Sequence, residues 1–531
     1  MKRPIPFLSH SLIFSFSHSL IFSFSHSLIL SFSHSLILSF SHFLILSFSH
    51  FLIASCDDYD SWTTNPSARL EMSQDTVAFD TLITGVGSPT KTLVARNRGN
   101  KGLRISRVAL KQGAASPFRV NVDGQYLYEG VGEDFEVRRK DSIYVRVEVT
   151  LPAMDSDDLQ DYSDELLFTL ESGATQRVML TASGMNVIVL RAETITTDQT
   201  LDSPRPYIVY DSLVVAPNAT LTLPEGCTLM FHDATSLLVH GTLVANGTVE
   251  RPVTFRGDRT DRMFPYLPYD NTPNRWGGIH FYADSHDNYL RQCDIHSGDF
   301  GIVCDSTDIQ DDVLLPWDDS HTNASRPMLV MEDCVVHNIG GAGLDFTHCR
   351  TQVTGTQISN TFGHCVSLRG GAHTFLHCTL AQFYPFSANR GDALSLGDFE
   401  DNVYRHLYGA YFFNCVITGY ADDVVMGHFT DNTIAEARFL FQNCLLRTVN
   451  PSDRERFLSV RYDVPDSLDV TSQDHFTLFD THAFLYDFTP DSLSAIRGWA
   501  DPEFTKRCPV DRLGRNRFSD GHPDAGAYEG L

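Results

Sequence analysis

Five ionisable side chains in the last third of the sequence have types suited to acid–base chemistry. The segments "SANRGDALSLGD" and "GYADDVVMGHF" supply Arg390, Asp392, Asp422, Asp423 and His428. Two carboxylates about 5 to 10 Å apart hydrolyse glycosidic bonds when one of them stays protonated. An arginine that neutralises a uronate carboxylate, beside a base, would instead support a lyase reaction. These five residues are the candidate catalytic group, and the alternative is that the paired aspartates are solvated at a turn.

A second group has the composition of a binding surface. The segment "DRMFPYLPYDNTPNRW" places four aromatic residues among prolines. Aromatic faces stack on sugar rings, and prolines lower the cost of ordering a loop. We predict that Phe264, Tyr266 and Tyr269 bind glycans, whereas Trp276 belongs to a W-G-G-I phrase and is expected in a core. The alternative is that these rings cover the flank of the scaffold.

The N-terminal region ends at a single cysteine, in "HFLIASCDDYD". From Ser9 an eight-residue unit such as SHSLIFSF repeats, and no acidic residue precedes Asp57. A basic start, an apolar stretch and small residues before a cleavage site are typical of a secretory signal. A membrane-spanning helix is the alternative, but serine and histidine recur throughout the stretch, and a period of eight keeps no helical face apolar.

The residues before this cysteine resemble the lipobox of bacterial lipoproteins. That resemblance implies a signal peptide over residues 1–55, acylation of Cys56 with palmitate-type chains, and a tether to residue 71. Acidic residues after the cysteine resemble the surface-export signal of Bacteroidetes lipoproteins, whereas in enteric bacteria an aspartate there resembles an inner-membrane retention signal. We favour an outer-membrane, lipid-anchored, outward-facing protein.

The net charge of −26 argues against nucleic acid and anionic lipid surfaces as partners. No C-x-x-C pair occurs, so a structural zinc site is not expected. The acidic segment "AMDSDDLQDYSDE" (153–165) has calcium-binding groups, but it lacks the glycine and spacing of an EF-hand loop. We therefore predict no metal and no cofactor.

Two patterns of short apolar runs divide the rest of the chain. Residues 72–190 alternate apolar and polar positions between frequent turn residues, which predicts a β-sandwich. "LVARNRGNKGLRISRV", followed by "FRV" and "VRVEV", resembles the immunoglobulin-like domains that bacterial surface proteins carry. Residues 200–505 continue with "SLLVHGTLVANG", "RPVTFRG" and "RWGGIHF", and this cadence resembles right-handed parallel β-helix proteins.

Five phrases in the second region share a cysteine followed two positions later by an aliphatic residue. Stacked coils would place these cysteines in one inward-pointing ladder of small apolar side chains. The alternative is that these cysteines bind a metal or carry out redox chemistry. The spacing between rungs exceeds one coil in places, and residues 349–371 are the expected unmarked coil. The five rungs are Cys293, Cys334, Cys378, Cys415 and Cys444.

The last segment, residues 506–531, contains "DRLGRNRFSDGHPDAGAYEGL" and resembles the closing segment of bacterial β-helix surface proteins. A β-helix exposes a strand edge at each end, so we expect this segment to cap it. Arg517 is expected to pair with Asp524 or Glu529.

The sequence thus predicts an all-β surface lipoprotein: an Ig-like sandwich followed by a right-handed parallel β-helix. The segments around Asp422, Asp423 and His428 have some likeness to the "GADD"-like and "GHG"-like motifs of pectin hydrolases, but those motifs lie much further apart in sequence, so the resemblance fails. Glycan or protein-partner binding is therefore favoured. A polysaccharide lyase or glycoside hydrolase on the same scaffold is the alternative. The fold alone does not show whether the protein binds or cleaves glycans.

Overall fold

The computed structural model describes residues 61–530 apart from 155, 265, 310–325, 401, 431–432, 435–436 and 450. Cys56 and the signal segment lie outside the described residues. The described chain is built almost entirely of strands, and its helical segments are single turns. None of the helices in these ranges has the length and apolarity needed to span a bilayer.

The first part of the described chain contains two five-stranded sheets that share one apolar core. The first sheet consists of β1 (Glu71–Met72), β3 (Lys91–Arg96), β8 (Ser142–Val149), β5 (Phe118–Val122) and β6 (Gln125–Tyr126). The second consists of β2 (Thr76–Ile83), β10 (Thr175–Met185), β9 (Gln160–Leu170), β4 (Leu103–Leu110) and β7 (Val131–Val137). This arrangement is a β-sandwich, and its assignment to the Ig-like family stays a prediction.

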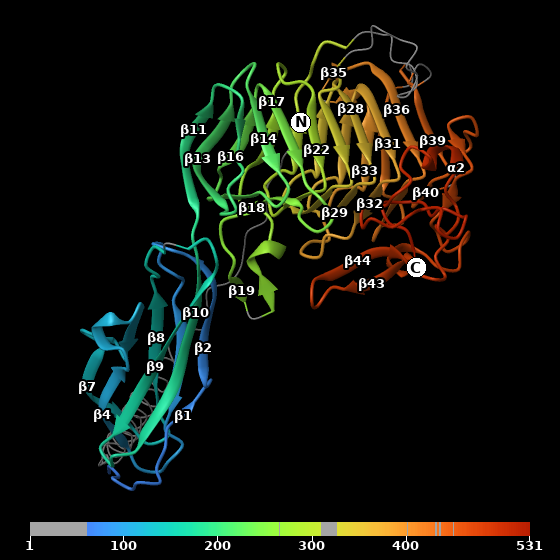
Figure 1. Cartoon of the computed structure of the whole chain (residues 1–531). Coiled ribbons are helices and arrows are strands. Elements are labelled where there is room, and N and C mark those ends of the chain that lie inside the picture. Colours follow the sequence, from blue (N-terminus) through green and yellow to red (C-terminus); the bar gives the residue numbers. More distant parts are fainter. Residues whose placement is uncertain are drawn as a thin grey trace, which may run out of the picture.

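The second part is a coil of parallel strands, which confirms the predicted parallel β-helix (Figure 1). It starts with the long strands β11 (Ile188–Ile195) and β13 (Tyr207–Val215), after which the coils build three rows of strands. Row A consists of β15 (Thr228–Phe231), β18 (Val253–Gly257), β23 (Cys293–His296), β26 (Val335–Ile339), β29 (Gln357–Thr361), β32 (Thr379–Gln382), β37 (Val416–Gly419), β40 (Leu445–Leu446) and β42 (Arg461–Tyr462).

The other two rows complete the coils. Row B consists of β16 (Ser236–Val239), β21 (Gly278–Phe281), β24 (Ile302–Cys304), β27 (Leu344–Thr347), β30 (Val366–Arg369), β33 (Leu394–Gly397) and β38 (Val425–His428). Row C consists of β12 (Gln199–Thr200), β14 (Thr220–Pro224), β17 (Thr242–Asn246), β22 (Asn288–Arg291), β25 (Leu329–Glu332), β28 (Arg350–Thr354), β31 (Gly371–Leu376), β36 (Leu407–Phe413), β39 (Phe439–Gln442) and β41 (Phe457–Leu458).

Smaller elements decorate the coils. Three are two-stranded hairpins: β19 (Arg262–Phe264) with β20 (Leu267–Pro268), β34 (Phe399–Glu400) with β35 (Val403–Tyr404), and β43 (Phe476–Asp480) with β44 (Leu485–Pro490). The helical turns are η1 (Gly113–Ala115), η2 (Tyr269–Asn271), η3 (Ser472–His475) and α2 (Pro502–Thr505).

Strand alternation fixes which side chains fill the coil and which face outward. Phe255, Ile295, Val336, Ile358 and Leu380 are successive register partners in row A, and all are buried in the core. Their neighbours in sequence therefore point to the outside of the coil. The outward side chains of row A are the ones that build the candidate site below.

The predicted ladder of buried cysteines is confirmed, and the ten cysteines in the described ranges are free. The structure adds hydrogen bonds that the prediction of apolar side chains did not include. The Cys378 N–H donates to Cys415 Sγ (3.5 Å), and the Cys415 N–H donates to Cys444 Sγ (3.4 Å). The Cys334 N–H donates in the same way to Thr356 Oγ1 (3.3 Å). Thr356 thus occupies a cysteine position, and residues 349–371 form the unmarked coil that was expected.

A left-handed turn precedes each rung of this ladder and forms the corner between rows C and A. The residues with positive φ are Gln292 (47°), Asp333 (52°), Gly355 (59°), His377 (51°), Asn414 (55°) and Asn443 (51°). Such a corner presents backbone and side-chain polar groups to a neighbouring segment.

The C-terminal segment, residues 506–531, contacts this corner along the side of the coil. The Gly526 N–H donates to the Asn414 carbonyl (2.8 Å), the Ala527 N–H to Thr379 Oγ1 (2.9 Å), and Gln292 Nε2 to the Arg512 carbonyl (2.9 Å). These partners belong to several coils, so the polar groups of the left-handed corner give the segment a lateral docking surface. That the segment also closes an end of the β-helix stays a prediction.

The predicted ion pair in this segment is absent. Arg517 is fully buried, and its Nη2 donates to the Ala527 carbonyl (3.1 Å). Among the residues that the structure describes, no carboxylate oxygen lies within ion-pair distance of Arg517. Asp524 and Glu529 are occupied by backbone donors, because Asp524 accepts from the Gly498 N–H (2.6 Å) and Glu529 accepts from the Asp524 N–H (3.1 Å).

Candidate functional site

Asp294, His296 and His337 form a polar cluster on the outer side of row A. Asp294 and His296 flank the inward-pointing Ile295 in β23, so both face outward. His337 is the register partner of His296 in the next coil, on β26. The two imidazole centroids lie 4.9 Å apart, which is about one strand spacing.

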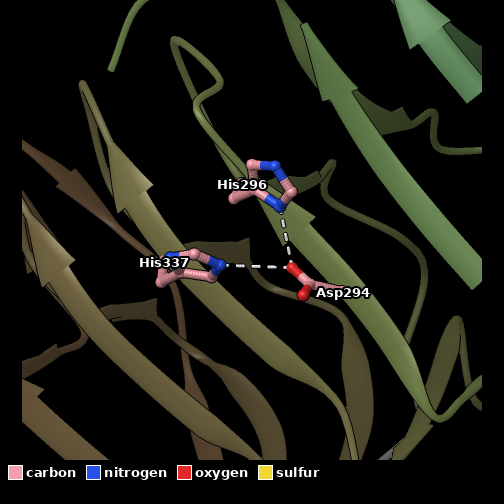
Figure 2. Close-up of side chains that lie close together, drawn as sticks. All are labelled: Asp294, His296 and His337. Atoms are coloured by element: carbon pink, nitrogen blue, oxygen red, sulfur yellow. Dashed lines mark hydrogen bonds and ion pairs between the residues drawn. The ribbon is translucent and has the colours of Figure 1, made fainter. Parts of the chain in front are cut away.

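The three side chains converge on one carboxylate oxygen (Figure 2). Asp294 Oδ1 lies 2.8 Å from His296 Nδ1 and 3.2 Å from His337 Nε2. Potential ligand atoms of the three residues all lie within 4.8 Å of one another. The side chain of His296 is only 9% exposed, whereas those of His337 and Asp294 are 25% and 31% exposed. The cluster is therefore buried on the His296 side and open to solvent on the other.

A fourth ionisable residue reaches the cluster from the long connection between β18 and β21. Asp270 lies in the turn η2, and its Oδ1 is 3.5 Å from His296 Nε2. Arg256 Nη2 lies 2.7 Å from the same oxygen. The turn is held in place because Ser297 Oγ donates to the Asp270 carbonyl (2.5 Å). A loop residue thus completes a site whose other members come from two strands.

The charges in this cluster stabilise one another. Burial opposes ionisation of Asp294, but His296 and His337 hold the pKa of its carboxyl well below the usual range. Burial likewise opposes a charge on His296, yet Asp294 and Asp270 raise the pKa of this imidazole to about 9. At neutral pH these interactions favour an imidazolium held between two carboxylates.

Exposed aromatic rings occur at the corner between rows A and B on either side of the cluster. We call these rings the aromatic track, and its members with their exposures are Phe264 (52%), Tyr266 (61%), Phe300 (44%), Phe362 (43%) and Phe386 (41%). From β18 to β32 the track passes four strand spacings, about 19 Å. Tyr384 supports it from beneath, because its ring lies 5.5 Å from Phe362 and 5.5 Å from Phe386.

Two hairpins lie at the ends of this face. The β19–β20 hairpin carries Phe264 and Tyr266, and the β43–β44 hairpin brings Phe484 to 5.4 Å from Phe386. Both hairpins lie below the coil on the same side in Figure 1. The aromatic track is thus flanked by irregular excursions from a regular scaffold, where binding residues are commonly found.

The structure separates the three predicted glycan-binding residues. Phe264 and Tyr266 are exposed and stack on each other at 5.7 Å. Tyr269 is only 5% exposed, and the guanidinium groups of Arg259 and Arg275 lie 5.0 and 5.2 Å from its ring. Tyr269 therefore braces the η2 turn and does not present a ring to solvent. Trp276 is fully buried and stacks on Phe231 at 4.4 Å, as expected for a core residue.

Part of the predicted catalytic group lies at the corner that leads into row B. Arg390 stacks on Tyr420 at 4.6 Å, and its Nη2 donates to the Ser387 carbonyl (2.8 Å). Asp392 Oδ2 lies 3.6 Å from His364 Nδ1. Asp392 and Asp423 each precede a row B strand, and those strands are neighbours.

The remaining members do not converge on these residues. The Asp422 side chain is 94% exposed and pairs with Arg447 Nη2 at 3.2 Å. Asp423 Oδ1 accepts from the Val425 N–H (3.2 Å), which is a turn contact. His428 stands at the opposite end of β38, as the register partner of Gly397. The five residues are therefore divided between the two ends of the row B strands.

One further constellation has the residue types of a hydrolase triad. His475 Nδ1 lies 3.1 Å from Ser494 Oγ, and His475 Nε2 lies 3.1 Å from Asp463 Oδ1. Ser494 is 6% exposed, and the other two are fully buried. The Thr418 hydroxyl also donates to the Asp463 carboxylate, and the Ser472 N–H donates to it at 2.9 Å. These bonds fasten η3 to the last coils, so the contact is structural.

Comparisons with known proteins identify no family. No protein-family model matches the chain, and no curated protein matches it. Among solved structures, it is similar to a protein of unknown function from Porphyromonas gingivalis W83, at 16% identity over 24% of this chain and 50% of that chain, with a TM-score of 0.18. The chain thus spans half of that structure.

Two other solved structures cover different parts of the chain. The PapD-like domain 7 of human CEP192 matches at 16% identity over 23% of this chain and 90% of that chain, with a TM-score of 0.17. The Agl-KA catalytic domain matches at 11% identity over 68% of this chain and 74% of that chain, with a TM-score of 0.19. Likenesses of this size carry no functional argument.

Proposed function

We propose that this chain is a lipid-anchored surface protein that binds glycans along the corner between rows A and B. The observation that carries the proposal is the aromatic track, whose five exposed rings follow strands β18, β23, β29 and β32, near the polar Asp294–His296–His337 cluster. Sugar rings present apolar faces and hydroxyl groups together, so a binding face needs aromatic planes next to hydrogen-bonding groups.

The length and rigidity of the face favour an extended glycan. Phe300 and Phe362 project from short turns between paired strands, so little conformational entropy is lost when these two rings bind. A track of about 19 Å is longer than a single sugar and suits several consecutive units of a polysaccharide. The strongly acidic chain disfavours polyanionic partners such as nucleic acid.

The anchor is part of the same proposal. Acylation of Cys56 would attach the protein to the outer membrane, and the residues up to 71 would act as a tether. The β-helix would then present the aromatic track to glycans outside the cell. A protein partner on the same face is the alternative that remains if no polysaccharide retards the chain.

The test is affinity gel electrophoresis of the purified full chain through neutral and acidic polysaccharides. Retardation by one of them is expected for the wild type, and the Phe300→Ala/Phe362→Ala variant should lose most of it, because each stacked ring contributes about 0.5 to 1.5 kcal/mol. Tyr128→Ala is the matched control, since Tyr128 is 74% exposed on the sandwich. Equal retardation of all three proteins would refute the proposal for this face.

An enzyme assay run in parallel addresses the alternative function. New reducing ends or unsaturated products from the same polysaccharides would show hydrolase or lyase activity. We do not propose catalysis by Arg390, Asp392, Asp422, Asp423 and His428, because His428 is separated from the other four residues by the length of its strand. The carboxylates and the histidine therefore do not form one acid–base site.

A further inference from the structure

We propose that Asp294, His296 and His337 bind one divalent transition-metal ion of the zinc class. The donor set is two imidazole nitrogens and one carboxylate oxygen, which are groups that first-row transition ions take from proteins. Calcium and magnesium prefer oxygen ligands, so this set favours a softer ion. This inference is independent of glycan binding, since it concerns the polar cluster and not the aromatic track.

The distances suit an ion at the point where the three side chains meet (Figure 2). With metal–ligand bonds of about 2.0 to 2.2 Å, ligand atoms around one ion stand about 3.0 to 3.5 Å apart. Asp294 Oδ1 lies 3.2 Å from His337 Nε2, within this range, and 2.8 Å from His296 Nδ1, so the carboxylate would move slightly away from His296 when an ion binds. Two of the ligands lie on one strand and the third on the register partner, so the coil itself holds the arrangement.

The second ring nitrogen of His296 supports this geometry independently. A histidine that binds a metal through one nitrogen usually donates its other N–H to a carboxylate, which fixes the tautomer and the ring. His296 Nε2 is buried and has no hydrogen-bond partner within the described residues, and Asp270 Oδ1 lies 3.5 Å from it. Metal binding at Nδ1 would place the proton on Nε2, directed at Asp270.

The surroundings leave one side of the ion open. The side chains of Asp294 and His337 are 31% and 25% exposed, so water or an oxygen of a bound molecule can complete the coordination. Arg256, at 2.7 Å from Asp270 Oδ1, offsets the charge of this second carboxylate. Asp270 is accordingly a positioning residue that orients His296, and the three ligands are the metal-contacting residues.

The experiment is calorimetric titration of ZnCl2 into the chelator-treated, purified full chain, with thermal unfolding of every variant as a folding check. One ion per chain is expected for the wild type. His337→Ala and Asp294→Ala should abolish this binding. Asp270→Asn, which keeps the shape of the side chain, should weaken it by roughly 10- to 100-fold, as changes to such carboxylates usually do.

His280→Ala is the matched control. His280 Nε2 lies 2.9 Å from Asp305 Oδ1, so it forms an outward histidine–carboxylate pair on row B that belongs to no three-residue cluster in the part of the chain that the structure describes. Zinc affinity should be unchanged in this variant. Absence of zinc binding by the wild type, undiminished binding by a folded His337→Ala or Asp270→Asn variant, or loss in His280→Ala would each overturn the proposal. Binding of CaCl2 in place of zinc would also overturn it.

Discussion

The sulfur of Cys415 provides a test of what the buried ladder does. Its Sγ accepts a hydrogen bond from the Cys378 N–H at 3.5 Å, and its thiol donates to the Phe413 carbonyl at 3.3 Å. The left-handed corner before each rung turns this N–H toward the next coil. The structure therefore indicates that the sulfur is a hydrogen-bonding group, whereas sequence patterning treats it as a small apolar side chain.

Cys415→Thr and Cys415→Val separate these two explanations, because the two replacements have nearly the same shape. Threonine can accept the Cys378 N–H as Thr356 accepts the Cys334 N–H two rungs earlier in the ladder. Valine cannot, and a buried N–H without an acceptor costs about 1 to 3 kcal/mol. Any strain from the added methyl group is common to both variants, so it cancels in the comparison.

The measurement is chemical unfolding followed by circular dichroism, with the change in unfolding free energy compared between the two variants. Cys415→Thr is expected to be the more stable by about 1 to 3 kcal/mol. Equal stabilities, or a more stable valine variant, would refute the reasoning and indicate that the cysteines contribute only by packing. The valine already present at position 253 agrees with the expectation, because the Cys227 N–H of the preceding coil donates to the Pro224 carbonyl (3.1 Å) and needs no side-chain acceptor.

Three further predictions concern buried groups in the last third of the chain. Burial raises the pKa of Glu529 from its ordinary value of 4.5 to about 8. Between these two values the folded chain keeps a proton that the unfolded chain releases, so stability should fall as pH rises from about 4.5 to about 8. Glu529→Gln should flatten that dependence in thermal unfolding. Phe412 stacks between Phe375 (4.9 Å) and Phe441 (4.7 Å), so Phe412→Ala should cost about 3 to 5 kcal/mol in chemical unfolding. Burial opposes ionisation of Asp463, but the hydrogen bond from His475 lowers the pKa of its carboxyl. The folded protein should therefore lose stability as pH falls below the ordinary pKa of an aspartate, and Asp463→Asn should remove this loss.

The repeat of cysteines was sufficient to predict the coils and their register. Because parallel strands stack directly, a side chain at a fixed distance from each cysteine must meet its equivalent in the next coil. His296 and His337 are both three residues after a cysteine, in "CDIH" and "CVVH". The same register that predicts the ladder therefore contains the signal for this histidine pair.

Other parts of the site had no such signal. Asp270 reaches His296 through a long connection whose path depends on Tyr269, Arg259 and Arg275, and no periodicity describes an irregular loop. The C-terminal segment packs on the left-handed corners of several coils. Its own sequence does not indicate which polar groups of those coils it contacts. Sequence patterns thus predict what strand pairing determines, and they fail where side chains from distant segments meet.

The coil and the η2 turn would contribute differently to how the site discriminates among metals. The coil fixes Asp294, His296 and His337 to within the precision of strand stacking, so these three alone would accept any ion that takes nitrogen and oxygen ligands. Asp270 adds a second carboxylate whose distance from His296 depends on the η2 turn and its contact with Ser297. A change in that turn would alter the orientation and basicity of one ligand without moving the other two. Affinity would therefore be adjusted in the loop, while the number and type of ligands are set by the register of the coil.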